Sequence, residues 1–132
     1  MSYLLDTHSF LWAVFSPEKL SRRARATIAD TSSAVCLSSI TLWEISLKFA
    51  LGKLVLKNTI PEDLVIVAQD MGLALVSPSA EESASFHKLP RAPHRDPYDR
   101  MLVWQAIQRQ LVLVAKESVL PAYRDAGLKT LW

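Results

Sequence analysis

The chain has 132 residues, half of them hydrophobic, so it is close to the commonest domain size and can bury a core of its own. Its 15 Lys and Arg nearly balance 13 Asp and Glu and form no polybasic run, which excludes nucleic-acid binding through bulk positive charge but not a local basic rim around an acidic site. We expect a single domain over residues 1–132.

The lone cysteine and the amino-terminal sequence bear on the compartment. Cys36 cannot form an intramolecular disulfide, and its apolar setting (AVCLSS) is typical of a buried thiol in a reducing compartment. The amino terminus lacks the pattern of a secretory signal, and no apolar stretch reaches the roughly 18 residues of a membrane span. We therefore expect a cytoplasmic protein without a membrane segment.

The first predicted strand is Ser2 to Leu5, a short apolar run that ends on Asp6 and precedes a helical pattern (FLWAVF). A strand that is apolar on both faces is typical of the centre of a covered parallel sheet, and its carboxyl end would place Asp6 at the crevice along the sheet's edge. Capping of the helix by Asp6 or Thr7, without any further role, is at least as well supported by the sequence.

A second buried strand is predicted at Ala34 to Leu37, followed by an apolar helix (TLWEISLKFALGKL) that Gly52 ends. Glu44 lies in the first turns of this helix and follows a strand, as Asp6 does. It either belongs to a capping box with Thr41 or points into the same crevice as Asp6. Lys48, four residues later, could pair with Glu44 at the surface for about 0.2–0.5 kcal/mol.

The rest of the chain continues the alternation of helices and strands, which predicts a three-layer α/β fold with a central, mainly parallel sheet of four to five strands. In order, the pattern predicts a helix opened at Pro61 and ended by Gly72, a strand at 73–78, a helix starting at Ser79, a proline-rich extended loop at 89–96, a helix from Asp96, a strand at Leu111 to Val114, and a last edge strand in the carboxyl-terminal segment.

Two acids, Asp96 and Asp99, lie three residues apart at the start of the helix after the proline-rich loop. Asp96 suits the N-cap and Pro97 the first helical position, so both carboxylates lie near the positive end of the helix. Such a pair is either a helix cap or half of a metal site. The local pattern taken alone favours the cap.

Four acidic positions follow a strand or begin the helix behind it, and in an open α/β sheet these places share one crevice. Carboxylates gathered there would repel one another unless a cation neutralised them, so their convergence would imply a metal ion. Because only oxygen ligands are available, the ion would be Mg²⁺ or Mn²⁺ rather than Zn²⁺, and such ions commonly serve phosphoryl chemistry. The four positions are Asp6, Glu44, the Asp96/Asp99 pair and Glu117.

Three ordered motifs, MSYLLDTH, SSITLWEISLKFALGKL and LPRAPHRDPYDRMLVWQA, resemble the VapC-type toxins of the PIN-domain ribonuclease family over nearly the whole chain. The resemblance implies a PIN-like α/β/α fold and a Mg²⁺- or Mn²⁺-dependent endoribonuclease. It also implies a small cognate antitoxin as inhibitor and a homodimer. By position it implies Asp6, Glu44 and Asp99 as the acids of the metal site, with Asp96 as a cap or an acid of the metal's outer shell.

The chain departs from the family at the fourth acid, where Thr, one residue and Asp are usual and Ala115-Lys116-Glu117 stands instead. Because Mg²⁺ demands near-octahedral geometry at about 2.0–2.1 Å, the longer Glu117 side chain could move from an inner to an outer ligand. This departure supports an alternative function, a catalytically weak PIN-like module that binds RNA or an antitoxin. A different Mg²⁺ phosphohydrolase is disfavoured, since three glycines form no phosphate-cradling loop.

The expected reaction is metal-assisted hydrolysis of an RNA phosphodiester, in which one or two ions activate water and polarise the phosphate. Thr7 could orient Asp6 or a water on the metal. For Arg100, an ion pair with Asp96 or Asp99 is an equal alternative to a phosphate contact. The catalytic candidates are Asp6, Glu44, Asp99 and Glu117, and the substrate candidates are Thr7, Lys48, Arg95 and Arg100.

Overall fold

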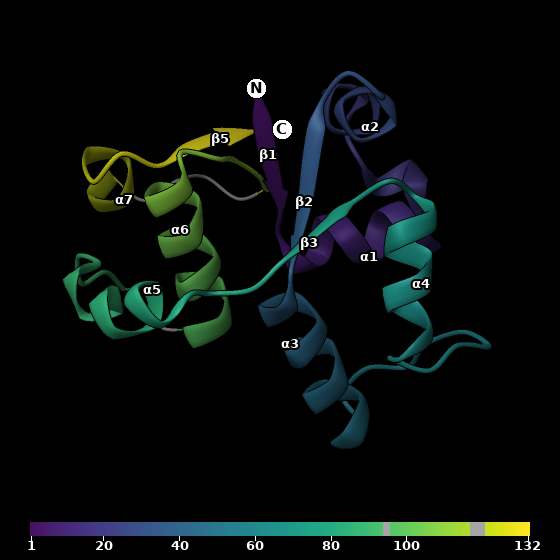
Figure 1. The fold of residues 1–132 in the computed structure, drawn as a ribbon. Coiled ribbons are helices and arrows are strands. Elements are labelled where there is room, and N and C mark those ends of the chain that lie inside the picture. Colours follow the sequence, from purple (N-terminus) through teal and green to yellow (C-terminus); the bar gives the residue numbers. More distant parts are fainter. Residues whose placement is uncertain (94–95, 117–120) are drawn as a thin grey trace.

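The computed structural model describes residues 1–93, 96–116 and 121–132, and its centre is one sheet of five parallel strands (Figure 1). The order in the sheet is β3-β2-β1-β4-β5, so β1 lies in the middle and β5 at an edge, as predicted. Neighbouring pairs are parallel throughout. The strands are β1 (Ser2–Leu5), β2 (Ala34–Ser38), β3 (Ala74–Val76), β4 (Val112–Val114) and β5 (Lys129–Leu131).

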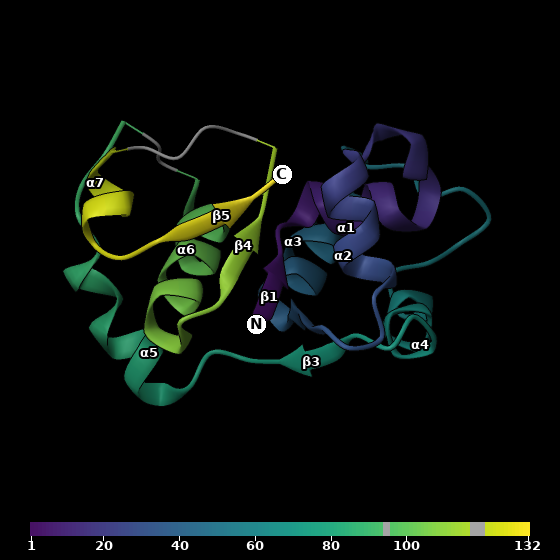
Figure 2. The same cartoon turned by 90° about the horizontal axis from the view of Figure 1, so that it is seen from above.

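Helices cover both faces of the sheet, which confirms the predicted three-layer α/β/α architecture. Figure 2 shows α1, α2 and α4 on one side and α5, α6 and α7 on the other. The described helices are α1 (Thr7–Phe15), α2 (Arg22–Ala29), α3 (Ser39–Ala50), α4 (Asp63–Asp70), α5 (Ala80–Ser85), α6 (Pro97–Arg109) and α7 (Pro121–Asp125), with single 3₁₀ turns η1 (Pro17–Lys19) and η2 (Phe86–Lys88).

The two hydrophobic cores follow from the alternation of side chains along β1. Leu5 packs with Phe10 of α1 in one core, whereas Leu4 packs with Leu102 of α6 in the other. Because successive strand residues point to opposite faces, a central strand needs apolar residues at every position. All four of these leucine and phenylalanine side chains are buried.

The starts of α5 and α6 follow the capping signals of the sequence, whereas α4 begins at Asp63 without a side-chain cap. Ser79 and Glu82 form a capping box at α5, and Asp96 caps α6 with Pro97 in its first turn. Of the two alternatives for Glu44, the capping box with Thr41 is wrong, because Ser38 caps α3 and its hydroxyl accepts from the backbone N–H of Ile40. Glu44 therefore lies inside the helix and not at its start.

Parallel pairing places the carboxyl ends of β1, β2 and β4 at the same edge of the sheet. The helices α1 and α3 begin directly after β1 and β2, and α3 contacts both α1 and α6. This edge is therefore where helices from both layers meet. None of the helices in the described parts of the chain has the length and apolar character that crossing a membrane requires.

Candidate functional site

Asp6 lies at the end of β1 and caps α1. Its Oδ1 accepts a hydrogen bond from the Ser9 backbone N–H at 2.8 Å, and its own N–H donates to the Val114 carbonyl of β4 at 3.1 Å. The Ser9 hydroxyl donates to the same carbonyl at 3.0 Å. The cap that the sequence suggested is thus confirmed, and it fixes Asp6 between the ends of two central strands.

Glu44 is a buried acid, with 3% of its surface exposed, and two side chains hold it. The Thr7 hydroxyl donates to Glu44 Oε1 at 2.7 Å and lies 3.2 Å from the Thr41 hydroxyl. Lys48 Nζ lies 2.5 Å from Glu44 Oε2. Because Thr7 follows Asp6 directly, these contacts join the acid at the end of β1 to the acid inside α3.

Lys48 is the positively charged partner of Glu44. The predicted pair with Glu44 is confirmed, but it is not a surface pair, because the Glu44 side chain is only 4% exposed while that of Lys48 is 40% exposed. The hydrogen bond to Glu44 raises the pKa of the Lys48 ammonium above its ordinary value, against the opposing effect of partial burial. The negative charges of Asp96 and Asp99 raise that pKa further, so Lys48 lies within the field of acids from both α3 and α6.

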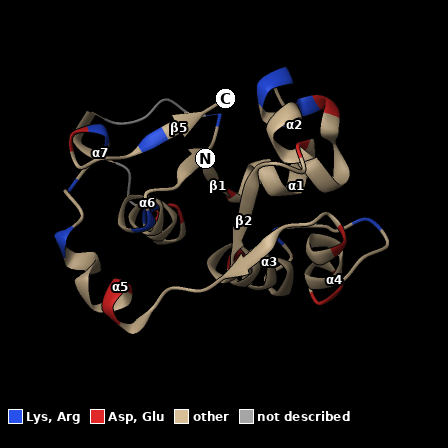
Figure 3. Cartoon of the chain, turned by 45° about the horizontal axis from the view of Figure 1, so that its top comes forward, with Lys and Arg blue, Asp and Glu red and all other residues tan. Residues whose placement is uncertain are grey.

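The start of α6 brings Asp96 and Asp99 to this edge of the molecule. Asp96 Oδ1 accepts from the backbone N–H groups of Tyr98 at 2.9 Å and Asp99 at 3.2 Å, which confirms the predicted cap. The Tyr98 ring lies edge-on to Trp43 of α3, with ring centroids 5.3 Å apart. The helices α3 and α6 contact each other, and each carries acidic residues (red in Figure 3).

The acids of this edge offer carboxylate oxygens, which are the donor atoms that a hard divalent cation prefers. The Lys48 ammonium already donates to Glu44, so this edge stabilises a positive charge. Within residues 1–93, 96–116 and 121–132, no three His, Cys, Asp or Glu side chains gather closely enough to form a metal-binding group. The printed contacts bring Thr7 and Lys48 to Glu44, whereas the carboxylates of Asp6 and Asp96 each accept from backbone N–H groups at the start of their own helix. Glu117 and Arg95 lie outside the described residues.

Arg100 takes part in contacts within the protein. Its guanidinium donates to the Pro90 carbonyl at 3.2 Å and to the Tyr123 hydroxyl at 2.8 Å. It also lies over the rings of Phe86 and Tyr123, at 5.5 and 5.9 Å from their centroids. These contacts fasten α6 to η2 and α7.

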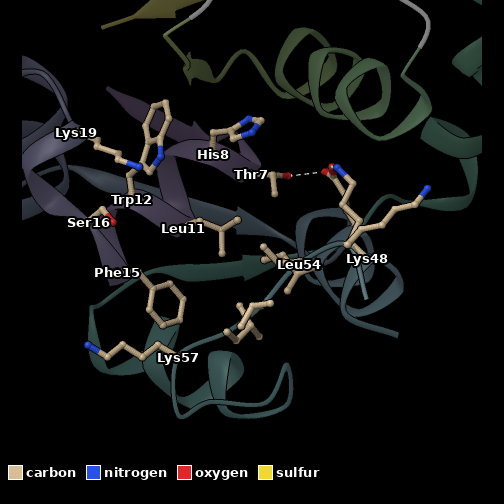
Figure 4. A pocket seen from close by; sticks show the side chains of 15 residues that line it. Thr7, His8, Leu11, Trp12, Phe15, Ser16, Lys19, Lys48, Leu54 and Lys57 are labelled. Carbon is tan, nitrogen blue, oxygen red and sulfur yellow. Dashed lines mark hydrogen bonds and ion pairs between the residues drawn. The ribbon is translucent and has the colours of Figure 1, made fainter. Parts of the chain in front are cut away.

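A pocket of about 580 Å³ adjoins Glu44 and Thr7 (Figure 4). Its walls come from α1 and η1, from α3, and from the loop at 53–57. Neither this pocket nor the contact of Thr41 with Thr7 could be predicted from the sequence. The sequence offers both Ser38 and Thr41 as caps of this helix, and because Ser38 is the N-cap, Glu44 lies beyond the first turn of α3.

Comparison with known proteins gives consistent matches. Residues 3–125 match the PIN domain family. Similar structures include VapBC2 from Rickettsia felis bound to a DNA fragment from their promoter (TM-score 0.70, 17% identity, 99% of this chain and 98% of that chain) and FitAcB from Neisseria gonorrhoeae (TM-score 0.61, 18% identity, 98% and 96%). FitAB bound to the IR36 DNA fragment is a third (TM-score 0.58, 16% identity, 99% and 94%). A comparison with curated protein sequences gave no match.

Proposed function

The chain belongs to the PIN domain family, and on that premise we propose that it is a metal-dependent endoribonuclease, the toxin of a toxin–antitoxin pair. Its structural neighbours are toxins of such systems, and PIN domains are typically nucleases that use divalent metals. The proposed reaction is hydrolysis of RNA phosphodiester bonds with Mg²⁺ or Mn²⁺. Asp6, Glu44 and Asp99 are the proposed acids of the site.

The observation that carries this proposal is the state of Glu44. A carboxylate that is 3% exposed is costly to bury unless a positive charge and hydrogen bonds compensate it, and here Thr7 and Lys48 do so. Helix packing alone would place an apolar residue at such a position. The burial of an acid beside the ends of β1 and β2 therefore supports a role in chemistry.

The chain's own residues would prepare the site in distinct ways. Thr7 fixes the direction of the Glu44 carboxylate, and Asp96, by capping α6, fixes the first turn that carries Asp99. Lys48 would bring positive charge to the phosphate group of the substrate. A bound Mg²⁺ or Mn²⁺ would polarise that phosphate and make water a better nucleophile.

Three further assignments belong to the proposal. We assign Glu117 as the fourth acid and Arg95 as a phosphate contact, both from the family resemblance. Asp96 is assigned to the outer shell of the metal in addition to its cap. For Arg100, whose guanidinium contacts Pro90 and Tyr123, we propose a supporting role in holding α6.

We further propose a small antitoxin as partner and a homodimer as the assembly. The described surface offers an apolar stripe at helical spacing along and just beyond α3. Trp43, Leu47 and Leu51 are 61, 40 and 58% exposed. Since such side chains gain free energy when a protein covers them, the stripe supports a protein interface next to Glu44.

The test is RNA cleavage by the chain purified free of any partner. We expect cleavage with Mg²⁺ or Mn²⁺, none with EDTA, and a large loss of rate in Asp6→Ala and Asp99→Ala. Asp70→Ala, which removes an exposed acid at the end of α4, serves as the matched control and should cleave normally. Metal-independent cleavage, or cleavage that survives both site substitutions, would refute the proposed site.

The second candidate is a catalytically weak PIN-like module that binds RNA or an antitoxin. The observation that favours it is the Ala115-Lys116-Glu117 departure, where the exposed Lys116 ammonium lies over the Trp12 ring, 5.8 Å from its centroid. Lys116 adds a positive charge next to the fourth acid in sequence. RNA binding without metal-dependent cleavage in the same assay would support this candidate.

A further inference from the structure

A buried polar pair joins the end of β2 to the middle of α6. The Ser38 hydroxyl donates to Gln105 Oε1 at 2.6 Å, and neither residue has any exposed surface. Ser38 is the last residue of β2 and the N-cap of α3, and Figure 1 shows α3 starting where that strand ends. Gln105 follows the buried Trp104 and precedes the buried Ala106 on α6. The pair is therefore a polar contact within a layer of mostly apolar side chains.

Core packing does not account for the Gln105 amide. Its Nε2 is buried, and no hydrogen-bond partner for it exists among the residues that the structure describes. A buried donor without a partner costs free energy, whereas a methionine or leucine of similar volume would fill the same space without that cost. A buried polar pair does fix how two elements pack, because its bond forms in only one register. The amide is therefore better explained by the geometry that it imposes than by the stability that it adds.

The Ser38 hydroxyl connects this bond to the start of α3. Besides donating to Gln105, it accepts from the backbone N–H of Ile40 at 3.1 Å, and that second bond is the cap of the helix. Glu44 lies in the second turn of α3. Because the rise and rotation per residue are fixed along a helix, the place of the cap determines the place of Glu44. One hydroxyl thus links α6 to the helix that carries the buried acid.

The helix α6 carries another acid of the proposed site. Asp99 lies six residues before Gln105 on this helix, and α3 and α6 contact each other. A second contact between the same helices is that of Trp43 with Tyr98, whose ring centroids are 5.3 Å apart. Two separate contacts restrict both the distance and the rotation between two helices. The buried pair is the polar one, so it determines the register most strictly.

We propose that Gln105 is a positioning residue of the metal site: through Ser38 it fixes α3 against α6 and so sets the distance between the Glu44 and Asp99 carboxylates. Because Gln105 is fully buried, it does not itself reach a metal ion or a substrate. A Mg²⁺ or Mn²⁺ ion tolerates little error in the placing of its oxygen ligands, so a small change of register weakens metal binding. The inference rests on the proposed function and adds a residue that determines the geometry of its site.

The experiment compares Gln105→Met with the wild type in two measurements on the full chain. Methionine keeps the length of the side chain and removes the amide. The first measurement is the Kd of Mn²⁺, read from the EPR signal of the free ion during a titration, and we expect it to rise about ten-fold, as for other groups that orient metal ligands. The second is made without metal and follows the NMR signal of the Trp43 indole N–H, which the Tyr98 ring shifts. We expect this signal to move because the register of the two helices changes.

Further variants make the result specific. Ser79→Ala removes the capping box of α5, a helix that carries none of the proposed acids, so it controls for a general loss of stability and should bind Mn²⁺ as the wild type does. Ser38→Ala should weaken Mn²⁺ binding at least as much as Gln105→Met. The double variant should weaken it no more than Ser38→Ala alone, since both substitutions break the same bond. Urea unfolding compares the stability of the variants, and Gln105→Leu replaces Gln105→Met if that variant does not fold.

Three outcomes overturn the inference. If Gln105→Met binds Mn²⁺ as tightly as Ser79→Ala does, the buried pair does not act on the metal site. If the Trp43 signal stays in place, the pair does not set the register of the helices. If the double variant weakens binding by the product of the two single effects, Gln105 does not act through Ser38.

Failure of the proposed function gives a different result. A wild-type chain that binds no Mn²⁺ refutes the proposed metal site, whatever the Trp43 signal does. A wild-type chain that binds Mn²⁺ and cleaves RNA, together with a Gln105→Met variant that does both equally well, refutes only the role of Gln105.

Discussion

Thr7→Val tests whether the buried contact with Glu44 stabilises the fold. Valine has nearly the shape of threonine, so the substitution leaves no cavity and removes only the hydroxyl. In the wild type this hydroxyl donates to the buried Glu44 carboxylate at 2.7 Å. A hydrogen bond to a charged group contributes about 1.5–3 kcal/mol, and its loss leaves an oxygen of Glu44 with one donor fewer. We expect the free energy of unfolding to fall by about 2 kcal/mol.

Urea unfolding followed by circular dichroism measures this change. For a small protein, a loss of about 2 kcal/mol lowers the midpoint by about 1 M with an unchanged slope. Thr59→Val is the matched control, because the Thr59 hydroxyl donates to the Lys57 carbonyl at 2.8 Å on an exposed loop, and water can replace that bond. A Thr7→Val midpoint within error of the Thr59→Val midpoint would show that Thr7 does not support Glu44.

Three other changes test separate parts of the structure. Lys48→Ala removes the cation next to Glu44. Because the Lys48 side chain is 40% exposed, we expect the free energy of unfolding to fall by only about 1–2 kcal/mol. Thermal unfolding should show that Mg²⁺ stabilises this variant more than it stabilises the wild type. Arg109→Met removes two hydrogen bonds to Glu82, whose pKa Arg109 holds below its ordinary value of 4.5. The stability that Arg109 contributes at about pH 7 should therefore disappear as the pH falls through that lowered pKa. Urea unfolding of both proteins at about pH 7 and at a pH below that pKa measures this, and a stability difference that stays the same at the two pH values would contradict it. Burial raises the pKa of the Cys36 thiol, so a thiol reagent at about pH 8 should react more slowly with the native chain than with the urea-unfolded chain, and equal rates would contradict the burial.

The fold could be predicted because its local signals agree with one another. Leu4 and Leu5 require apolar surroundings on both faces of β1, which only a central strand in a covered sheet provides. The capping residues Ser79 and Asp96 fix where the helices after the loops begin. Each signal involves residues close in sequence, so no tertiary information was needed to find it.

The environment of Glu44 could not be predicted in this way. Thr41 and Glu44 satisfy the spacing of a capping box, and the sequence does not show that Ser38 takes the cap first. The side chain that decides the matter is Thr7, which lies 37 positions away in sequence and comes from another helix. The strength of the Glu44–Lys48 pair likewise depends on burial, which follows from how α3 packs between α1 and α6.

A cap and a place in a catalytic site are compatible roles for Asp6 and Asp96. Each uses Oδ1 to accept from backbone N–H groups at a helix start, and this bond fixes where the carboxylate lies. A capped acid therefore says little about function, since capping explains its position completely. Glu44 is the informative acid, because neither capping nor core packing accounts for a carboxylate inside α3 that needs Thr7 and Lys48 to be stable there. A test of function is accordingly sharpest at Glu44 and its two partners.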